Sequence, residues 1–169
     1  MRTFASVALL LLAPAASQAF EQAFEPPAFI VSVPRVPNLQ IASAPKGGDS
    51  ISVHAGGRDA VFAVEITAEA SAQAGGSRTC ASAFLRDLVR RPNMPDRDSI
   101  YRAPLDASTF LVLYMFEQRG KKVLHAHLLS AAAGTHCIHA HFSRDMVVGE
   151  DEDKWRTTFN DARIREGRK

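Results

Sequence analysis

The chain has 169 residues, of which 46% are hydrophobic and 22% charged, and its 20 basic and 18 acidic side chains give a formal net charge of +2. This length is typical of one domain with a sizeable buried core, and the near balance of charge argues against a nucleic-acid partner. Local charge runs, such as the acidic residues 150–153, are typical of solvated faces.

The N-terminal residues 1–19 have the three parts of a secretory signal peptide. Met1 and Arg2 give a basic start, residues 7–12 an apolar core, and residues 17–19 a small-x-small cleavage site. The apolar run is shorter than the roughly 20 residues of a membrane-spanning helix, and no later stretch reaches that length. We therefore expect the signal peptide to be removed and the mature protein, without a transmembrane segment, to be periplasmic or secreted.

The N-terminal part of the mature chain is predicted to be an arm followed by a β meander. Residues 20–28 carry two prolines and no sustained hydrophobic period, which indicates an extended arm ahead of a single globular domain at 29–169. Short β-rich stretches then alternate with turns that contain proline or glycine, a pattern typical of antiparallel strands. The predicted strands are residues 29–33, 39–44, 51–55 and 60–68, and the predicted turns are residues 34–37, 45–48 and 56–57.

Two segments show the period of an amphipathic helix. The first, residues 79–90, has apolar side chains at three- and four-residue steps and ends before a proline. The second begins near Gly149, where an acidic run favours a helix N-terminus, and Trp155 and Phe159 belong to its apolar stripe. A short last strand is expected around residues 162–165.

The centre of the sheet is predicted between the two helices. Residues 110–116, 123–129 and 136–142 alternate in the manner of strands, and a tight turn at 119–120 and a loop at 131–134 join them. Both faces of these strands are substantially apolar, so the sheet needs cover on both sides, which the two helices can give. The expected fold class is therefore α+β: an antiparallel sheet of about six or more strands flanked by helices on both faces, an α/β/α sandwich.

The order of these elements, which closes with Phe159-Asn160-Asp161-Ala162-Arg163-Ile164, resembles the PsbP-like domain family. The resemblance covers roughly residues 29–164 and rests on element order and on the closing segment. It implies the α/β/α sandwich and a binding, assembly or chaperone-like role without catalysis. It carries no catalytic residue onto this chain.

The two cysteines of the chain, Cys80 and Cys137, are predicted to form a disulfide, because a lone pair in an oxidising compartment most often does. A crosslink of this span is worth roughly 4 kcal/mol in the chain-entropy model. The bond would require the first helix to lie over the histidine-bearing face of the sheet. The alternative is a reactive Cys137 with the neighbouring His136 or His139 as its base.

Four histidines form the sharpest candidate site: His125 and His127 on one predicted strand, His139 and His141 on the next. Residues two apart point to the same side of a strand, so both pairs share a face. A register with His127 opposite His139 and His125 opposite His141 would cluster four imidazoles, which suits zinc or copper. A one-step shift that places His127 opposite Cys137 would spread the cluster. The alternatives are a polar stripe satisfied by Tyr114 and the backbone, and a pH-responsive cluster.

No residue is predicted to be catalytic. The chain has neither a Gly-x-Ser-x-Gly elbow nor a His-Glu-x-x-His helix, so an envelope hydrolase is the third of three interpretations. The first is an exported, non-enzymatic inhibitor, immunity-type protein or assembly factor that binds another envelope or exported protein stoichiometrically. The second is a periplasmic metal-binding protein that uses the histidine hairpin, and no cofactor other than zinc or copper is expected.

Partner contacts are expected in loops, which a sandwich leaves exposed. The turn with Arg119, Lys121 and Lys122 and the connection that ends at Tyr101 carry basic and aromatic groups of the kind enriched at interface hot spots. The alternative for both segments is an ordinary solvated loop.

Overall fold

The computed structural model describes residues 19–24, 28–37, 41–43, 50–55, 62–70, 76–92, 94–131 and 136–167. The predicted signal peptide, apart from Ala19, and the predicted turns at 45–48 and 56–57 lie outside the described residues. The elements in chain order are β1 (Ala19–Phe24), β2 (Phe29–Pro37), β3 (Ile41–Ser43), β4 (Ser50–Ala55), β5 (Ala63–Ala70), α1 (Ser77–Leu88), η1 (Arg97–Ser99), β6 (Tyr101–Pro104), β7 (Thr109–Gln118), β8 (Lys121–Ser130), β9 (His136–Asp145), α2 (Glu152–Phe159) and β10 (Arg163–Glu166).

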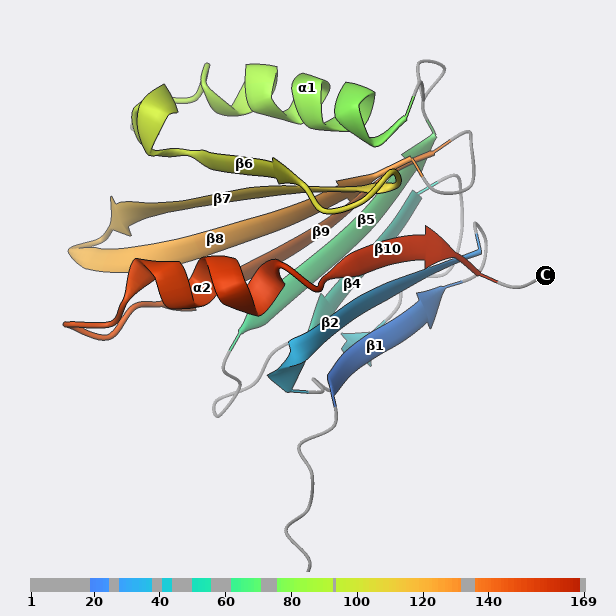
Figure 1. Cartoon of the computed structure of the whole chain (residues 1–169), viewed down its shortest axis with the longest axis horizontal. Coiled ribbons are helices and arrows are strands. Elements are labelled where there is room, and N and C mark those ends of the chain that lie inside the picture. Colours follow the sequence, from blue (N-terminus) through green and yellow to red (C-terminus); the bar gives the residue numbers. More distant parts are fainter. Residues whose placement is uncertain are drawn as a thin grey trace, which may run out of the picture.

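The strands form two antiparallel sheets (Figure 1). The large sheet has seven strands in the order β3-β4-β5-β9-β8-β7-β6, and the small sheet has three in the order β1-β2-β10. The two strands that carry the histidine pairs, β8 and β9, are neighbours near the middle of the large sheet. Their side chains therefore lie far from either sheet edge.

The predicted α/β/α sandwich is wrong. The described part of the chain is mostly β, with two short α-helices. One face of the large sheet is covered by α1, which contacts β7, β8 and β9, whereas the small sheet and α2 cover the opposite face (Figure 1). The large sheet needs cover on both faces, as expected, but a second sheet occupies most of the face where a helix was predicted.

Residues 19–24, most of which belong to the predicted extended arm, form β1 and pair with β2. Phe20 and Phe24 point to the same side of this strand, and both are buried. The ring of Phe20 meets Phe142 of the large sheet edge-on, with centroids 5.6 Å apart, and the ring of Phe24 stacks on Phe29 at 4.7 Å. These rings supply the apolar contact that holds a short strand in place.

Strand β2 continues through residues 34–37, where a turn was predicted. Val36 in this segment is buried, and Pro37 pairs with Ala19 across a register shift in β1. A proline has no amide proton for the ladder and is tolerated at such irregularities. The prolines of this segment therefore mark the irregular end of a strand.

The later elements lie close to where the hydrophobic period predicts them. The helix α1 begins two residues before the predicted one and ends two before it, and β7, β8 and β9 each contain a predicted central strand. The helix α2 is capped by Asp151, whose side chain accepts a hydrogen bond of 2.9 Å from the amide of Asp153. The short last strand is present as β10.

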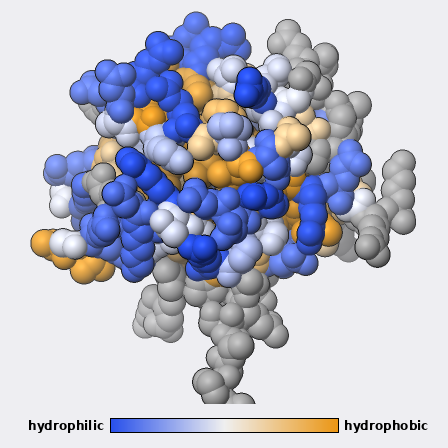
Figure 2. Space-filling model, viewed as in Figure 1, coloured by the Kyte–Doolittle hydropathy of each residue, from blue (hydrophilic) through white to orange (hydrophobic). Residues whose placement is uncertain are grey.

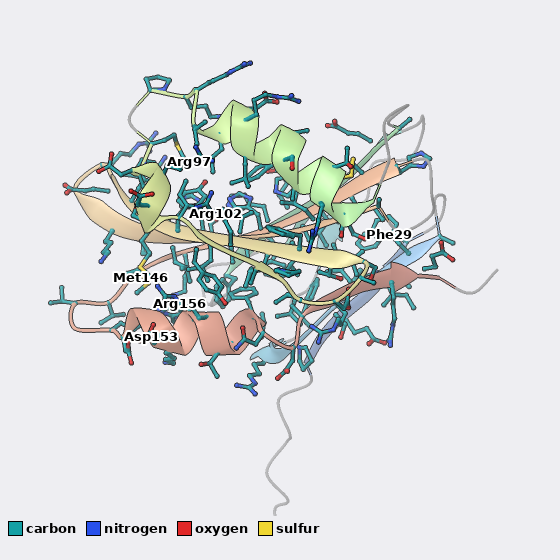
Figure 3. All side chains as sticks on the ribbon, turned by 45° about the horizontal axis from the view of Figure 1, so that its top comes forward. Phe29, Arg97, Arg102, Met146, Asp153 and Arg156 are labelled. Carbon is teal, nitrogen blue, oxygen red and sulfur yellow. A yellow bond between two sulfur atoms is a disulfide. The ribbon has the colours of Figure 1, made fainter. Side chains whose placement is uncertain are left out.

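The predicted disulfide between Cys80 and Cys137 is confirmed, with a Cα–Cα distance of 5.7 Å (Figure 3). It joins α1 to β9 and places α1 over the histidine-bearing face, as expected. The alternative of a reactive Cys137 thiol is thereby wrong, because neither sulfur is free. None of the described helices is long and apolar enough to cross a membrane.

The main hydrophobic core fills the space between the two sheets and α2. Phe142 of β9 lies at its centre, fully buried, and its ring makes edge contacts with Phe20, Phe62 and Phe159 at centroid distances of 5.6, 6.2 and 5.4 Å. One side chain thus links β9 to β1, to the start of β5 and to α2.

We expect Phe142→Ala to lower the free energy of unfolding by about 3–5 kcal/mol, because the variant loses the buried ring and leaves a cavity. Urea unfolding of the mature protein measures this change. Val148→Ala is the matched control: its side chain is fully exposed, and its effect should stay within about 0.5 kcal/mol. A loss below about 1 kcal/mol for Phe142→Ala would show that the two sheets do not share this core.

We expect the double variant Cys80→Ala with Cys137→Ala to lose roughly 2–4 kcal/mol of stability, because the crosslink restrains the unfolded chain. Amide protons of α1 should also exchange faster, since the bond is what ties the helix to β9. The wild-type protein with its disulfide reduced is the control and should match the double variant. Two free thiols in the unfolded, unreduced wild-type protein would contradict the assignment.

Candidate metal centre

Strands β8 and β9 direct four histidines onto one face of the large sheet. His125 and His127 belong to β8, and His139 and His141 belong to β9. Their alternation with Ala126, Leu128, Ile138 and Ala140, which are all fully buried on the opposite face, sets this orientation. His127 is buried, and the other three histidines are partly buried beneath or beside α1. The prediction that the four share a face agrees with the strand pairing.

The register between the histidine pairs differs by two residues from the one that would place His127 opposite His139. His127 lies directly opposite His141, His125 opposite Ser143, and His139 opposite Leu129. A shift of two keeps every side chain on its face, because the side-chain period of a strand is two. The pairs predicted to be direct neighbours are therefore diagonal neighbours, and the cluster still forms.

The four imidazoles form one cluster in which each ring contacts at least one other. The rings of His127 and His141 stack with centroids 4.3 Å apart and an interplanar angle of 5°. His127 Nδ1 lies 2.7 Å from His139 Nε2, and His125 Nδ1 lies 3.0 Å from His141 Nε2, both within hydrogen-bond distance. One ring nitrogen from each of His125, His127 and His141 lies within 4.8 Å of the others. These three residues are the group that could hold one metal ion.

Aromatic side chains enclose the cluster. Phe84 of α1 contacts the rings of His127 and His139, with centroids 4.6 and 4.9 Å away. Tyr114 of β7 stacks on His125 at 5.1 Å, and its hydroxyl lies 3.1 Å from His127 Nε2. The disulfide and Phe84 both come from the face of α1 that meets the sheet, one turn apart. The helix therefore covers the cluster and gives it a low-dielectric environment.

Burial lowers the pKa of every histidine in the cluster. It lowers the pKa of His141 to about 3, with the charges of His125 and His139 adding to the effect, and that of His139 to about 4, with Arg91 adding. The pKa of His127 falls well below its usual range, chiefly through burial, and that of His125 falls for the same reason. The four imidazoles are consequently neutral at neutral pH, and His139 and His141 stay neutral through the range in which a pH-responsive site would titrate.

One nitrogen in the cluster has no partner. A neutral imidazole has one N–H donor and one lone pair, and His125 uses Nδ1 in its contact with His141. His125 Nε2 is buried without a hydrogen bond among the described residues. When the Nδ1–H of His125 donates a hydrogen bond to Nε2 of His141, the Nε2 of His125 carries a lone pair without a partner. An unpaired buried polar group costs roughly 1–3 kcal/mol, a cost that a bound cation would remove.

A carboxylate beside the cluster was missed at the sequence level. Glu65 of β5 lies directly opposite His141 of β9, so both side chains project from the same face. Glu65 is exposed, whereas its neighbours Val64 and Ile66 are buried on the other face. The alternation within β5 was readable in the sequence, but the pairing of β5 with β9 was not. The acidic group lies at the open side of the cluster.

The residues predicted to contact a partner do not gather on one surface. Arg119, Lys121 and Lys122 lie at the β7–β8 turn, where Arg119 adopts a φ of 55° and Lys121 pairs with Asp145. Tyr101 pairs with Leu113, six positions before Arg119, which is about 20 Å along a strand. The ring of Tyr101 also lies under the guanidinium of Arg156, 4.9 Å away. Their role at an interface stays a prediction.

Comparison with known proteins bears on the fold alone. No protein-family model and no curated protein matches the chain. A crystal structure of a protein from Bacteroides thetaiotaomicron is similar, with a TM-score of 0.52 and 13% sequence identity. The match covers 90% of this chain and 49% of that one, so the chain spans about half the length of the structure that it resembles. The two-sheet architecture therefore occurs in another protein.

We expect the metal-free protein to lose stability as the pH falls from about 6.5 to about 4. In this window the unfolded histidines bind protons and the buried ones do not, so stability rises with pH by about 1.4 kcal/mol per pH unit for each histidine held neutral. Urea unfolding at several pH values measures the slope. His141→Gln removes one such group. The variant should reduce the slope by about 1.4 kcal/mol per pH unit, which is the contribution of one proton. A slope unchanged by this variant would contradict the burial of His141.

Proposed function

We propose that the protein binds a transition-metal ion, zinc or copper, through His125, His127 and His141. The observation that carries the proposal is the approach of three ring nitrogens to within 4.8 Å of one another. Imidazole nitrogen is a preferred ligand of both ions. Three such ligands leave a fourth position for water, for His139 or for a carboxylate such as Glu65.

The protonation state of the cluster favours metal binding over proton binding. A histidine binds a metal through a lone pair, so the imidazole must be unprotonated. Burial lowers the pKa of His141 to about 3 and also depresses those of His125 and His127. Protons therefore do not compete for these nitrogens at neutral pH. The bare nitrogen of His125 supports the same assignment.

The surroundings of the cluster match those of a buried metal site. Tyr114 contacts His127 Nε2 at 3.1 Å and can orient that ring in the way that outer partners orient metal ligands. His125, His139 and His141 are only partly buried, which leaves a path to solvent. The exposed carboxylate of Glu65 next to His141 favours the approach of a cation along this side.

The proposed location is the periplasm or the exterior of the cell. The Cys80–Cys137 disulfide supports an oxidising compartment, and the predicted signal peptide supplies the route. Stoichiometric binding of an envelope or exported protein, predicted from the sequence, stays a prediction beside the metal proposal.

We expect the metal-free mature protein to take up one zinc or copper ion per chain. Replacing His127 or His141 by glutamine should weaken binding by more than about tenfold, because even the loss of a supporting group around a metal commonly has that effect. Titration calorimetry measures the affinity and mass spectrometry of the intact protein the stoichiometry. The loaded protein should also melt at a higher temperature, since an ion at 100 times its Kd adds about 2.7 kcal/mol of stability.

His136→Gln is the matched control, because His136 belongs to β9 but lies outside the cluster. This variant should bind the ion as the wild type does. Circular dichroism of each variant shows that it is folded. Uptake that persists in a folded His127→Gln variant, or that falls equally in His136→Gln, would overturn the proposal, as would the absence of stoichiometric uptake by the wild type.

A further inference from the structure

A second candidate site lies on the other side of α1, where the helix faces η1 and β6. It is a cavity of about 350 Å³ lined by Ser82, Leu85, Arg86, Val89, Arg97, Ile100 and Arg102. We infer that this cavity binds a small organic oxyanion, a carboxylate or a phosphate ester, through Arg86, Arg97 and Arg102. Its volume is within the range of about 300–1,000 Å³ that is typical of small-molecule sites.

Three separate elements bring the arginines together. The lining residues of α1 are spaced three, four and seven positions apart, so they form one continuous stripe of the helix. Arg97 comes from η1 and Arg102 from β6, and Figure 3 shows both on the side of these elements that faces α1. The sequence separates Arg86 from Arg102 by a connection containing η1, which is why no linear pattern of basic residues marks the site.

Three positively charged side chains line the cavity. Within the described part of the chain, none of the three guanidinium groups forms an ion pair, although Arg144, Arg156, Arg163 and Arg165 do. Like charges around one cavity repel each other, and an anion between them converts that repulsion into attraction. Guanidinium groups also match the geometry of carboxylates and phosphates, which they bind through paired N–H donors. The chemistry of the lining therefore selects an oxyanion.

Apart from Ser82, the remaining walls of the cavity are apolar. Leu85 and Ile100 belong to the second hydrophobic cluster, and Val89 has 48% of its surface exposed. Figure 2 shows hydrophobic residues open to solvent between hydrophilic ones in the upper part of the molecule, in the region of α1 and β6. An apolar surface next to guanidinium groups favours a ligand that has a hydrophobic body as well as a charged group. An inorganic anion would leave these apolar side chains in contact with water.

This cavity is distinct from the histidine cluster. Cys80 and Phe84 project toward the sheet and the histidines, whereas the stripe with Arg86 and Val89 projects toward η1 and β6. No residue that lines the cavity belongs to the three-histidine group. The inference consequently stands or falls independently of metal binding.

The test is calorimetric titration of the metal-free mature protein with phenyl phosphate and with benzoate, which separate the two sources of an oxyanion. We expect saturable binding of at least one of them, weaker binding of inorganic phosphate, and none of uncharged phenol. Arg86→Gln, Arg97→Gln and Arg102→Gln should each weaken binding by about tenfold or more, because each removes a charge-assisted hydrogen bond. Higher ionic strength should weaken it as well.

Arg78→Gln is the matched control, since Arg78 is an exposed residue of α1 that does not line the cavity. It removes the same charge and should leave the affinity unchanged. Three results would overturn the inference: no saturable binding of either aromatic anion, an equal effect of Arg78→Gln, or equal affinity for inorganic phosphate. Melting curves of all four variants show whether each is folded. For any variant that is destabilised, changes in the NMR chemical shifts of the backbone amides of α1 and β6 during titration with the anion locate the bound anion.

Discussion

The bond between Cys80 and Cys137 determines which face of the large sheet is covered by α1, and both candidate sites depend on that choice. With the helix fixed over β9, Phe84 lies on the imidazoles and shields them from water. Low dielectric then keeps the histidines neutral and makes any unpaired nitrogen costly. The opposite stripe of the same helix is left to face η1 and β6. A single covalent constraint thus favours a largely buried, neutral cluster on one side of the helix and a basic cavity on the other.

Hydrophobic period alone predicts the elements that carry the histidines. Strong alternation in β7, β8 and β9 predicts three adjacent strands, and it also predicts the common face of the four histidines. The register of β8 against β9 could not be predicted from this alternation, because a shift of two residues leaves every side chain on the same face.

The second sheet could not be predicted for a different reason. β1 is short, and its two phenylalanines are buried only because β2 and the large sheet are present to receive them. β10 pairs with β2 from the far end of the chain. Long-range packing decides such pairing, and the hydrophobic period within one segment carries no information about it. The same holds for Glu65, whose place beside His141 follows from the pairing of β5 with β9. It also holds for the three arginines, which only the tertiary fold brings around one cavity.

The small sheet also constrains when the fold can be completed. Its middle strand, β2, lies between the first and the last strands of the described chain, and Val31 of β2 pairs with Ile164 of β10. Closing a contact between such distant residues requires nearly the whole chain, and contacts of high sequence separation form slowly. A chain in which β10 has not yet docked therefore leaves one edge of β2 unpaired and the underlying core open to solvent. Until β10 pairs with it, this edge of β2 can pair with another chain, so aggregation during folding depends on how soon β10 takes its place.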